Sequence, residues 1–290
     1  MKKIKILIPI YNDWQSLNKL LSDIDKHLEE SQHDISLIVI NDASSEKNSD
    51  KIPTLKKISS IKIINMKKNQ GHARCIATGL KYIYEKEDFD YVIPMDGDGE
   101  DRPDEISLLL DKINNNPNML ITANRVKRSE GVIFRFCYAI HKFLTFVFTS
   151  QSIKFGNFTC LPKSIVGEII LDSCLWNSFS GTLASLYKNR LSISSIRGKR
   201  YFGPSKMSFF NLLIHSVSII SVFKITVLTR CLIFLIVYLL LISKSVSLIT
   251  SIPVFLLFVM VISVLAVGKR ENIFELEESL SNISNTEDIK

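Results

Sequence analysis

Two long apolar stretches near the C-terminus limit what this chain can fold into more than any other feature. Residues 225–242 and 246–267 each approach the roughly 20 apolar residues that an α-helix needs to cross a bilayer. The short connection at 243–245 predicts a tight hairpin. Buried helices of a soluble core would carry polar residues at helical spacing, and these stretches carry almost none. We therefore expect two transmembrane helices.

The placement of charge predicts how this hairpin is oriented. The chain has 36 lysines and arginines against 29 aspartates and glutamates, a net charge of +7. Cations lie towards the outer ends of the hairpin, at Lys224, Arg230 and residues 269–270, whereas the turn has only Lys244. The positive-inside rule then predicts a multi-pass protein of the cytoplasmic (inner) membrane, with both termini in the cytoplasm. Nucleic-acid binding would also suit a basic chain, but we expect none because no recognition module occurs.

Two further segments flank the hairpin. Residues 205–224 alternate apolar groups with polar ones, which predicts an interfacial amphipathic helix, although the periodicity fits a surface helix of the globular domain equally well. Residues 268–290 are polar and acidic. They predict a cytosolic tail with a short helix followed by disorder.

Residues 1–204 have the pattern of a cytosolic α/β domain. Runs rich in isoleucine and valine alternate with helical patterns, the clearest of which has Leu17, Leu21 and Ile24 on one face. This alternation predicts a Rossmann-like, mostly parallel sheet with helices on both faces. The expected strands are residues 4–10, 35–40, 61–64, 91–95 and 119–122.

Carboxylates follow three of these strands. They are Asp13 after the first strand, Asp42 after the second, and Asp96 and Asp98 after the fourth. Ligands of such sheets bind at the carboxyl ends of the strands, so we expect these side chains at one edge. Dense like charge favours a bound cation, and oxygen ligands indicate Mg²⁺ or Mn²⁺ together with a nucleoside diphosphate. Taken alone, the Asp-Gly-Asp-Gly segment fits a solvated turn equally well.

Four segments carry a resemblance to a known family. Residues 8–13 (IPIYND), 39–44 (VINDAS), 69–74 (NQGHAR) and 95–105 (MDGDGEDRPDE) resemble, in the same order, the motifs of family 2 glycosyltransferases. With the hairpin, the chain up to about residue 270 is similar to the polyprenyl-phosphate glycosyltransferase branch, which includes dolichyl-phosphate mannose synthase and GtrB-type enzymes. The resemblance implies a GT-A fold and a UDP- or GDP-linked sugar donor.

The resemblance also implies roles for single residues. Asp96 and Asp98 match the catalytic aspartate pair of the family, and the implied metal ligands are Asp96, Asp98 and Glu100. The implied donor-binding residues are Pro9, Tyr11, Asp13, Asp42, Arg74 and Asp96. Among these, Asp42 would contact the base or ribose and Arg74 the donor phosphates or the sheet edge. Asn41, Ala43 and Asp13 differ from the commoner aspartate, glycine and glutamate, which leaves the nucleotide open.

Basic residues near the membrane are candidates for holding an acceptor phosphate, because guanidinium groups match phosphate oxygens. Residues 200–206 resemble the pattern that this branch places around the lipid phosphate. Asn157 lies in a segment where relatives have an aspartate and an arginine that contact sugar and acceptor. Both are missing here, so Asn157 is expected to bind a hydroxyl. The acceptor candidates are Arg125, Arg128, Asn157, Arg200, Ser205 and Lys206.

Missing acids predict the acceptor chemistry. Transfer to a sugar hydroxyl needs a general base, yet residues 163–203 contain only Glu168 and Asp172 as acids. A phosphate monoester is already largely dianionic near neutral pH and needs no base. We therefore expect inverting transfer to a membrane polyprenyl phosphate, in the synthesis or modification of cell-envelope glycans.

Two other functions fit the same residues. One is a family 2 transferase that adds a sugar to a lipid-diphosphate-linked glycan or a glycolipid. The other is a non-catalytic membrane scaffold that binds nucleotide sugars, against which the Asp96 and Asp98 pair argues. The sequence is also compatible with a homo-oligomer and leaves the oligomeric state open.

Overall fold

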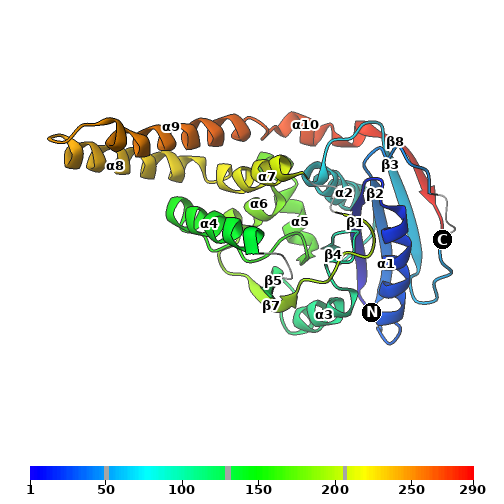
Figure 1. The fold of residues 1–290 in the computed structure, drawn as a ribbon. Helices are drawn as coiled ribbons and strands as arrows, with labels where there is room; N and C mark the ends of the chain where they lie inside the picture. The colour runs from blue at the N-terminus through cyan, green and yellow to red at the C-terminus, as the bar shows by residue number, and fades with distance from the viewer. Residues whose placement is uncertain (49–51, 128–131, 205–207) are drawn as a thin grey trace.

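The computed structural model describes residues 1–48, 52–127, 132–204 and 208–290 (Figure 1). The strands are β1 (Lys3–Ile10), β2 (Asp34–Asn41), β3 (Ser60–Met66), β4 (Tyr91–Pro94), β5 (Ile121–Lys127), β6 (Thr159–Pro162), β7 (Leu191–Ile196) and β8 (Ile283–Asp288). The helices of the sheet domain are α1 (Trp14–His27), α2 (His72–Lys86), α3 (Ile106–Asn115), α4 (Val132–Thr149), α5 (Lys163–Ile169) and α6 (Phe179–Leu186). Beyond them lie α7 (Phe209–Ser221), α8 (Lys224–Ile242), α9 (Leu248–Gly268) and α10 (Ile273–Glu277), and three short 3-10 helices are η1 (Pro103–Glu105), η2 (Ser173–Trp176) and η3 (Ser279–Asn282).

The described strands form one sheet in the order β7-β5-β6-β4-β1-β2-β3-β8. Strands β4, β1, β2 and β3 pair in parallel, as do β5 and β7, whereas β6 and β8 run antiparallel to their neighbours. Helices cover both faces (Figure 1). The predicted mostly parallel α/β fold is therefore confirmed.

Two apolar cores hold these layers together. Strand β1 is buried from Ile4 to Ile10, because alternate side chains face helices on opposite sides of the sheet. On one side Leu17 and Leu21 of α1 join the core, and on the other Ile76 and Leu80 of α2 do. Helix α2 packs closely on β1, since a Cβ added at Gly79 would lie 2.4 Å from the Leu7 side chain.

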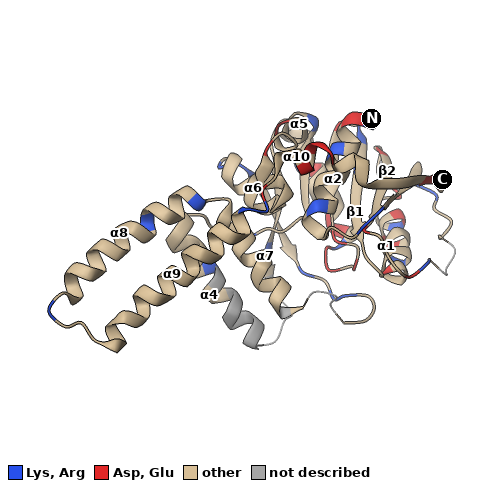
Figure 2. Cartoon of the chain, turned by 90° about the horizontal axis from the view of Figure 1, so that it is seen from above, with Lys and Arg blue, Asp and Glu red and all other residues tan. Residues whose placement is uncertain are grey.

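Helices α8 and α9 form the expected hairpin, and both are long and apolar enough to cross a membrane. Their ends lie within two residues of the predicted stretches. Most of their large apolar side chains are exposed, which suits a lipid environment. Figure 2 shows few charged residues along the hairpin except near its base and at its turn. At the base, Lys224 pairs with Glu271 at 2.5 Å.

Helix α4 was not predicted from the sequence. It exposes apolar side chains at Ile140, Phe143 and Phe146, and its C-terminal end contacts the hairpin, where Arg230 of α8 donates a 2.6 Å hydrogen bond to the Val147 carbonyl. Helix α7 forms within the predicted segment 205–224 and also exposes large apolar groups, including Phe210. The domain therefore presents two apolar helices beside the hairpin.

The expectation of disorder in the tail is wrong. The predicted short helix is present as α10, but the chain then forms η3 and strand β8, which pairs antiparallel with β3. Its register places Glu287 opposite Ile63 and Asn285 opposite Asn65. Strand β3 would otherwise be an open sheet edge, whose backbone groups can pair with any extended chain regardless of its polarity. Composition alone therefore missed this strand.

Candidate active site

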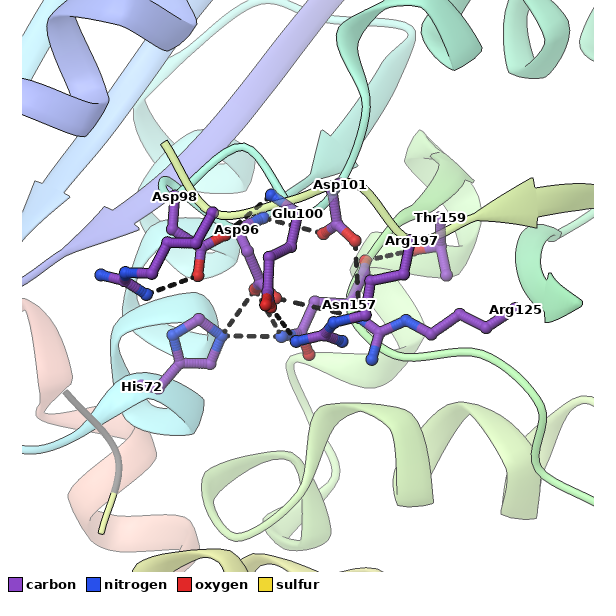
Figure 3. A network of polar contacts seen from close by, with 10 residues as sticks. His72, Asp96, Asp98, Glu100, Asp101, Arg125, Asn157, Thr159 and Arg197 are labelled. Carbon is purple, nitrogen blue, oxygen red and sulfur yellow. Dashed lines mark hydrogen bonds and ion pairs between the residues drawn. The ribbon is translucent and has the colours of Figure 1, made fainter. Parts of the chain in front are cut away.

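The acids predicted from the 95–105 segment gather in the loop after β4 (Figure 3). The loop folds on itself, because the Asp96 backbone N–H donates to the Asp101 carboxylate at 2.9 Å and the Glu100 N–H to Asp98 at 3.0 Å. Gly99 makes the turn in the left-handed region, with φ of 86°. Asp101 is only 3% exposed. Four carboxylates are thus held within six residues.

Asp96 is well paired. Its Oδ1 lies 3.2 Å from His72 Nε2 and accepts a 3.0 Å hydrogen bond from Asn157, while Arg125 Nη2 lies 3.9 Å from Oδ2. Burial alone would raise the pKa of Asp96, but the hydrogen bond and charge of His72, together with Arg125, lower that pKa well below its usual value. In turn, burial lowers the pKa of His72, and the Asp96 carboxylate more than reverses this. Asp96 is therefore ionised at neutral pH.

Asp98 and Asp101 are less well compensated. Burial, with a smaller effect from the Asp96 charge, raises the pKa of Asp98 to about 6 and that of Asp101 to about 7. Arg200 Nη1 lies 2.7 Å from Asp98, and Arg125 Nη2 lies 3.4 Å from Asp101. The loop thus carries more negative charge than its arginines neutralise.

A segment that follows β7 lies across the acidic loop. We call residues 197–201 the arginine segment. Its backbone donates to the loop twice, from Gly198 to the Glu100 carbonyl at 2.8 Å and from Tyr201 to the Asp98 carbonyl at 2.9 Å. Its arginines pair with acids as well: Arg197 with Glu100, and Arg200 with both Asp98 and Asp13. Along the chain, this segment precedes α7 and the candidate transmembrane hairpin.

The predicted donor residues other than Arg74 and Asp96 lie in two places, near the acidic loop and at the turn before α2. Asp13 joins the acidic loop through Arg200, and Pro9 lies buried at the end of β1. Tyr11 is 42% exposed beside them. Asp42 is only 4% exposed, and its carboxylate accepts the Gln70 and Gly71 N–H groups at 2.8 and 2.9 Å. Asp42 therefore holds the turn before α2, and its predicted contact with the base or ribose stays a prediction.

Arg74 contacts the C-terminal tail. Its guanidinium lies 3.4 Å from Glu275 of the tail and 5.1 Å from the centre of the Trp176 ring. It makes no ion pair with the acids of the loop after β4 among the described residues. Its predicted contact with the donor phosphates or the sheet edge stays a prediction.

Some of the acceptor candidates contact the acidic loop, and the others lie outside the described residues. Arg125, Asn157 and Arg200 all contact the acidic loop, and the chain passes so closely over Arg125 that a Cβ at Gly156 would lie 2.7 Å from it. Arg128, Ser205 and Lys206 lie outside the described residues. Two other cations, Lys188 and Arg190, line a separate polar cavity of about 250 Å³ beside β5 and β7.

Sequence reasoning did not single out His72, Asp101 or Arg197. His72 and Asp101 lie inside the motif segments 69–74 and 95–105, and Arg197 lies just before the segment 200–206. Each was visible as part of a pattern, but only the fold shows that they converge.

Comparison with known proteins identifies the fold and the family of this chain. The mostly parallel sheet with acids at the ends of its strands is a GT-A-like fold, seen also in solved glycosyltransferase structures. Residues 5–162, more than half of the chain, match the model of the glycosyl transferase family 2, so the chain belongs to that family.

The relatives and solved structures are distant. The undecaprenyl-phosphate 4-deoxy-4-formamido-L-arabinose transferase of Proteus mirabilis is 25% identical over 220 residues, and that of Klebsiella pneumoniae is 24% identical over 219. Both alignments cover 73% of this chain, which spans about 65% of each relative's length.

Among solved structures, glucosyl-3-phosphoglycerate synthase from Mycobacterium tuberculosis, in complex with Mn²⁺, UDP and phosphoglyceric acid, has a TM-score of 0.53 at 13% identity over 79% of this chain and 78% of that one. Mannosyl-3-phosphoglycerate synthase from Rubrobacter xylanophilus has a TM-score of 0.52 at 12% identity over 76% and 72%. At these identities the likeness shows the fold alone.

Proposed function

We propose that the protein is an inverting, metal-dependent glycosyltransferase. It moves a sugar from a UDP- or GDP-linked donor to a membrane polyprenyl phosphate, in the synthesis or modification of cell-envelope glycans. One observation carries the proposal: the acidic loop after β4 is paired with the arginine segment, which leads towards α7 and the candidate transmembrane hairpin. The relatives from Proteus mirabilis and Klebsiella pneumoniae are undecaprenyl-phosphate transferases, which supports the same acceptor class.

The acidic loop fits a divalent cation by its chemistry. Burial, with a smaller effect from the Asp96 charge, raises the pKa values of Asp98 and Asp101, so a bound cation would stabilise their ionised forms. Carboxylate oxygens are also the ligands that Mg²⁺ and Mn²⁺ prefer. As they stand, no three described acidic, histidine or cysteine side chains form a ready metal site, and Asp98 and Glu100 pair with arginines instead. We propose that Asp96 and Asp98, with Glu100, would hold the ion. When bound, it would stabilise negative charge on the nucleoside diphosphate leaving group.

The arginines around the loop are proposed to bind phosphate. Arg125, Arg197 and Arg200 are held at the acids by ion pairs, and each presents a fork of N–H donors that suits phosphate oxygens. A phosphate acceptor needs no general base from the protein. The two acids available between residues 163 and 203 are engaged elsewhere: Glu168 accepts from the Tyr187 hydroxyl, and Asp172 accepts the Cys174 N–H at 2.8 Å.

Membrane placement completes the proposal. Helices α4 and α7 expose apolar side chains beside the hairpin, so both would lie in the interface of the bilayer. The positive-inside rule predicts that this domain lies on the cytoplasmic side. A lipid phosphate at the bilayer surface would then reach the acids from the side of α7.

The direct test is a transfer assay. Detergent-purified full-length protein is incubated with polyprenyl phosphate, Mn²⁺ or Mg²⁺ and a panel of UDP- and GDP-sugars, and the lipid product is identified by its mass. We expect a polyprenyl monophosphate sugar that requires the cation. Product formed only on a glycolipid or a lipid-diphosphate-linked glycan would replace the proposed acceptor with the alternative one. Binding without any product would favour a scaffold.

A further inference from the structure

The C-terminal tail returns from the hairpin to the first turn of α2. Glu275 accepts a 2.7 Å hydrogen bond from the Trp176 indole N–H, and its carboxylate lies 3.4 Å from Arg74 Nη2. The Arg74 guanidinium stacks over the Trp176 ring. The next residue, Leu276, is fully buried in the core on the α2 side of the sheet. The tail is therefore packed against α2 by both apolar and charged contacts.

The same turn of chain reaches the candidate donor site. The Gln70 and Gly71 N–H groups bind the Asp42 carboxylate, and His72 contacts Asp96. Residues 70–74 thus touch the end of β2, the end of β4 and the tail. A movement of this turn would shift the Asp42 and Asp96 carboxylates, because both contact it directly.

Charge makes Glu275 important at this junction. The Arg74 Nε is buried without a hydrogen-bond partner among the described residues. A second cation, Arg270, lies nearby: burial lowers the pKa of Arg270, and the charge of Arg74 lowers that pKa further. The hydrogen bond from Trp176, and to a smaller extent the Arg74 charge, lower the pKa of Glu275, so its carboxylate is charged at neutral pH. Glu275 is the acid that pairs with Arg74 among the described residues.

We propose that Glu275 is a positioning residue for the donor site. By holding Arg74 against Trp176, it fixes the first turn of α2, and through this turn it orients Asp42 and His72. The segment that follows the membrane hairpin thereby contributes to donor binding without touching the donor. This proposal rests on the proposed function only for the identity of the ligand, a nucleoside diphosphate.

Glu275→Gln tests the proposal, because it keeps the shape and the Trp176 contact but removes the charge that faces Arg74. Glu277→Gln is the matched control, since Glu277 is an acid of the same short helix and its side chain forms no ion pair with Arg74 among the described residues. The Glu275 side chain is half exposed, at 49%, so we expect a moderate effect: UDP or GDP should bind about threefold to tenfold more weakly in calorimetry with Mn²⁺. The control should match the wild type.

Hydrogen exchange gives a second readout that does not depend on activity. The Gln70 and Gly71 amides, which bind Asp42, should exchange faster in Glu275→Gln than in the control, while the β1 amides keep their protection. The paired charge reversal, Arg74→Glu with Glu275→Arg, should recover part of the protection that Arg74→Glu alone loses. In the transfer assay, the donor KM should rise with kcat nearly unchanged.

Two results would overturn the proposal. One is equal exchange and equal nucleotide affinity in Glu275→Gln and Glu277→Gln. The other is faster exchange throughout the sheet, which would mean that Glu275 only stabilises the fold. If the wild type binds neither UDP nor GDP, the proposed function fails, yet the exchange experiment still decides whether Glu275 holds the turn.

Discussion

Two clusters of charge in this molecule contain similar residues but behave differently. On the sheet, Glu87 lies between Lys5 and Lys62, whose Nζ atoms are 2.8 and 2.6 Å from its carboxylate oxygens. Burial would raise the pKa of Glu87, but the two lysines reverse this and lower it. In the acidic loop, arginines are also close, yet the pKa values of Asp98 and Asp101 remain raised to about 6 and 7.

The difference lies in the balance of charge. Two lysines face one glutamate in the first cluster, which is therefore satisfied by the protein alone. In the second, Asp13 and the four loop acids outnumber Arg125, Arg197 and Arg200. Uncompensated buried charge destabilises a fold, and where it persists it marks a site that binds something else. Glu87 should thus affect stability, and Asp98 should affect activity.

The largest expected effect is on catalysis. Asp98→Asn should lower transfer by about 100-fold or more, because it removes a charge that the proposed reaction needs at the leaving group. It should leave the melting temperature nearly unchanged, since it also removes a carboxylate with a raised pKa. Asp104→Asn is the matched control, because Asp104 lies in the same segment but pairs with Arg102. Activity that survives in Asp98→Asn at the level of this control would refute the role of the loop.

The next effect is on stability. Glu87→Gln should lower the free energy of unfolding by about 2–3 kcal/mol, because the buried Lys5 and the half-buried Lys62 lose their shared partner. Specific activity of the folded enzyme should not change. Asp88→Asn offers a comparison, since Asp88 is exposed and its pair with Lys3 should contribute little. If both substitutions changed stability equally, the charge cluster around Glu87 would have no special role in stabilising the fold.

A smaller effect should distinguish acceptor-binding residues from donor-binding residues. Arg200→Ala should raise the KM for polyprenyl phosphate by about tenfold, through loss of hydrogen bonds to a charged group. Arg200→Lys should recover only part of this, because lysine lacks the fork geometry. Lys199→Ala, at an exposed neighbouring position, serves as the control in the same steady-state assay. A change confined to the donor KM would move Arg200 to the donor side.

Much of this organisation could be predicted from the sequence, and the omissions have physical causes. Alternating isoleucine-rich strands and helical patterns indicate the sheet because buried parallel strands need apolar side chains on both faces. The order of acids at strand ends follows from that topology. Strand β8 could not be predicted, because a polar strand at an edge is held by backbone pairing and leaves no apolar pattern.

The pairings within the site were harder to predict than its members. Asp98 and Arg200 were each named from local motifs, but 102 residues separate them, and the ion pair appears only when β7 is placed beside β5. Arg74 shows the opposite case. Its motif indicates the donor site, whereas its surroundings include Glu275, 201 positions away, on a tail that composition describes as polar and disordered.

The last and smallest effect is the pH dependence of the Glu87 cluster. The pKa of Glu87 in the folded protein lies below its ordinary value of 4.5, so the carboxylate stabilises the fold fully above that value. This contribution should be lost as the pH falls through the lowered pKa. The difference in unfolding free energy between wild type and Glu87→Gln should therefore stay constant from neutral pH to about 5.5 and shrink below 4.5, by at most about 1.4 kcal/mol for each pH unit. Denaturant unfolding of both proteins in one detergent measures it. A difference that grew on acidification would mean that Glu87 is destabilised by burial, as Asp98 and Asp101 are, and the contrast between the two clusters would disappear.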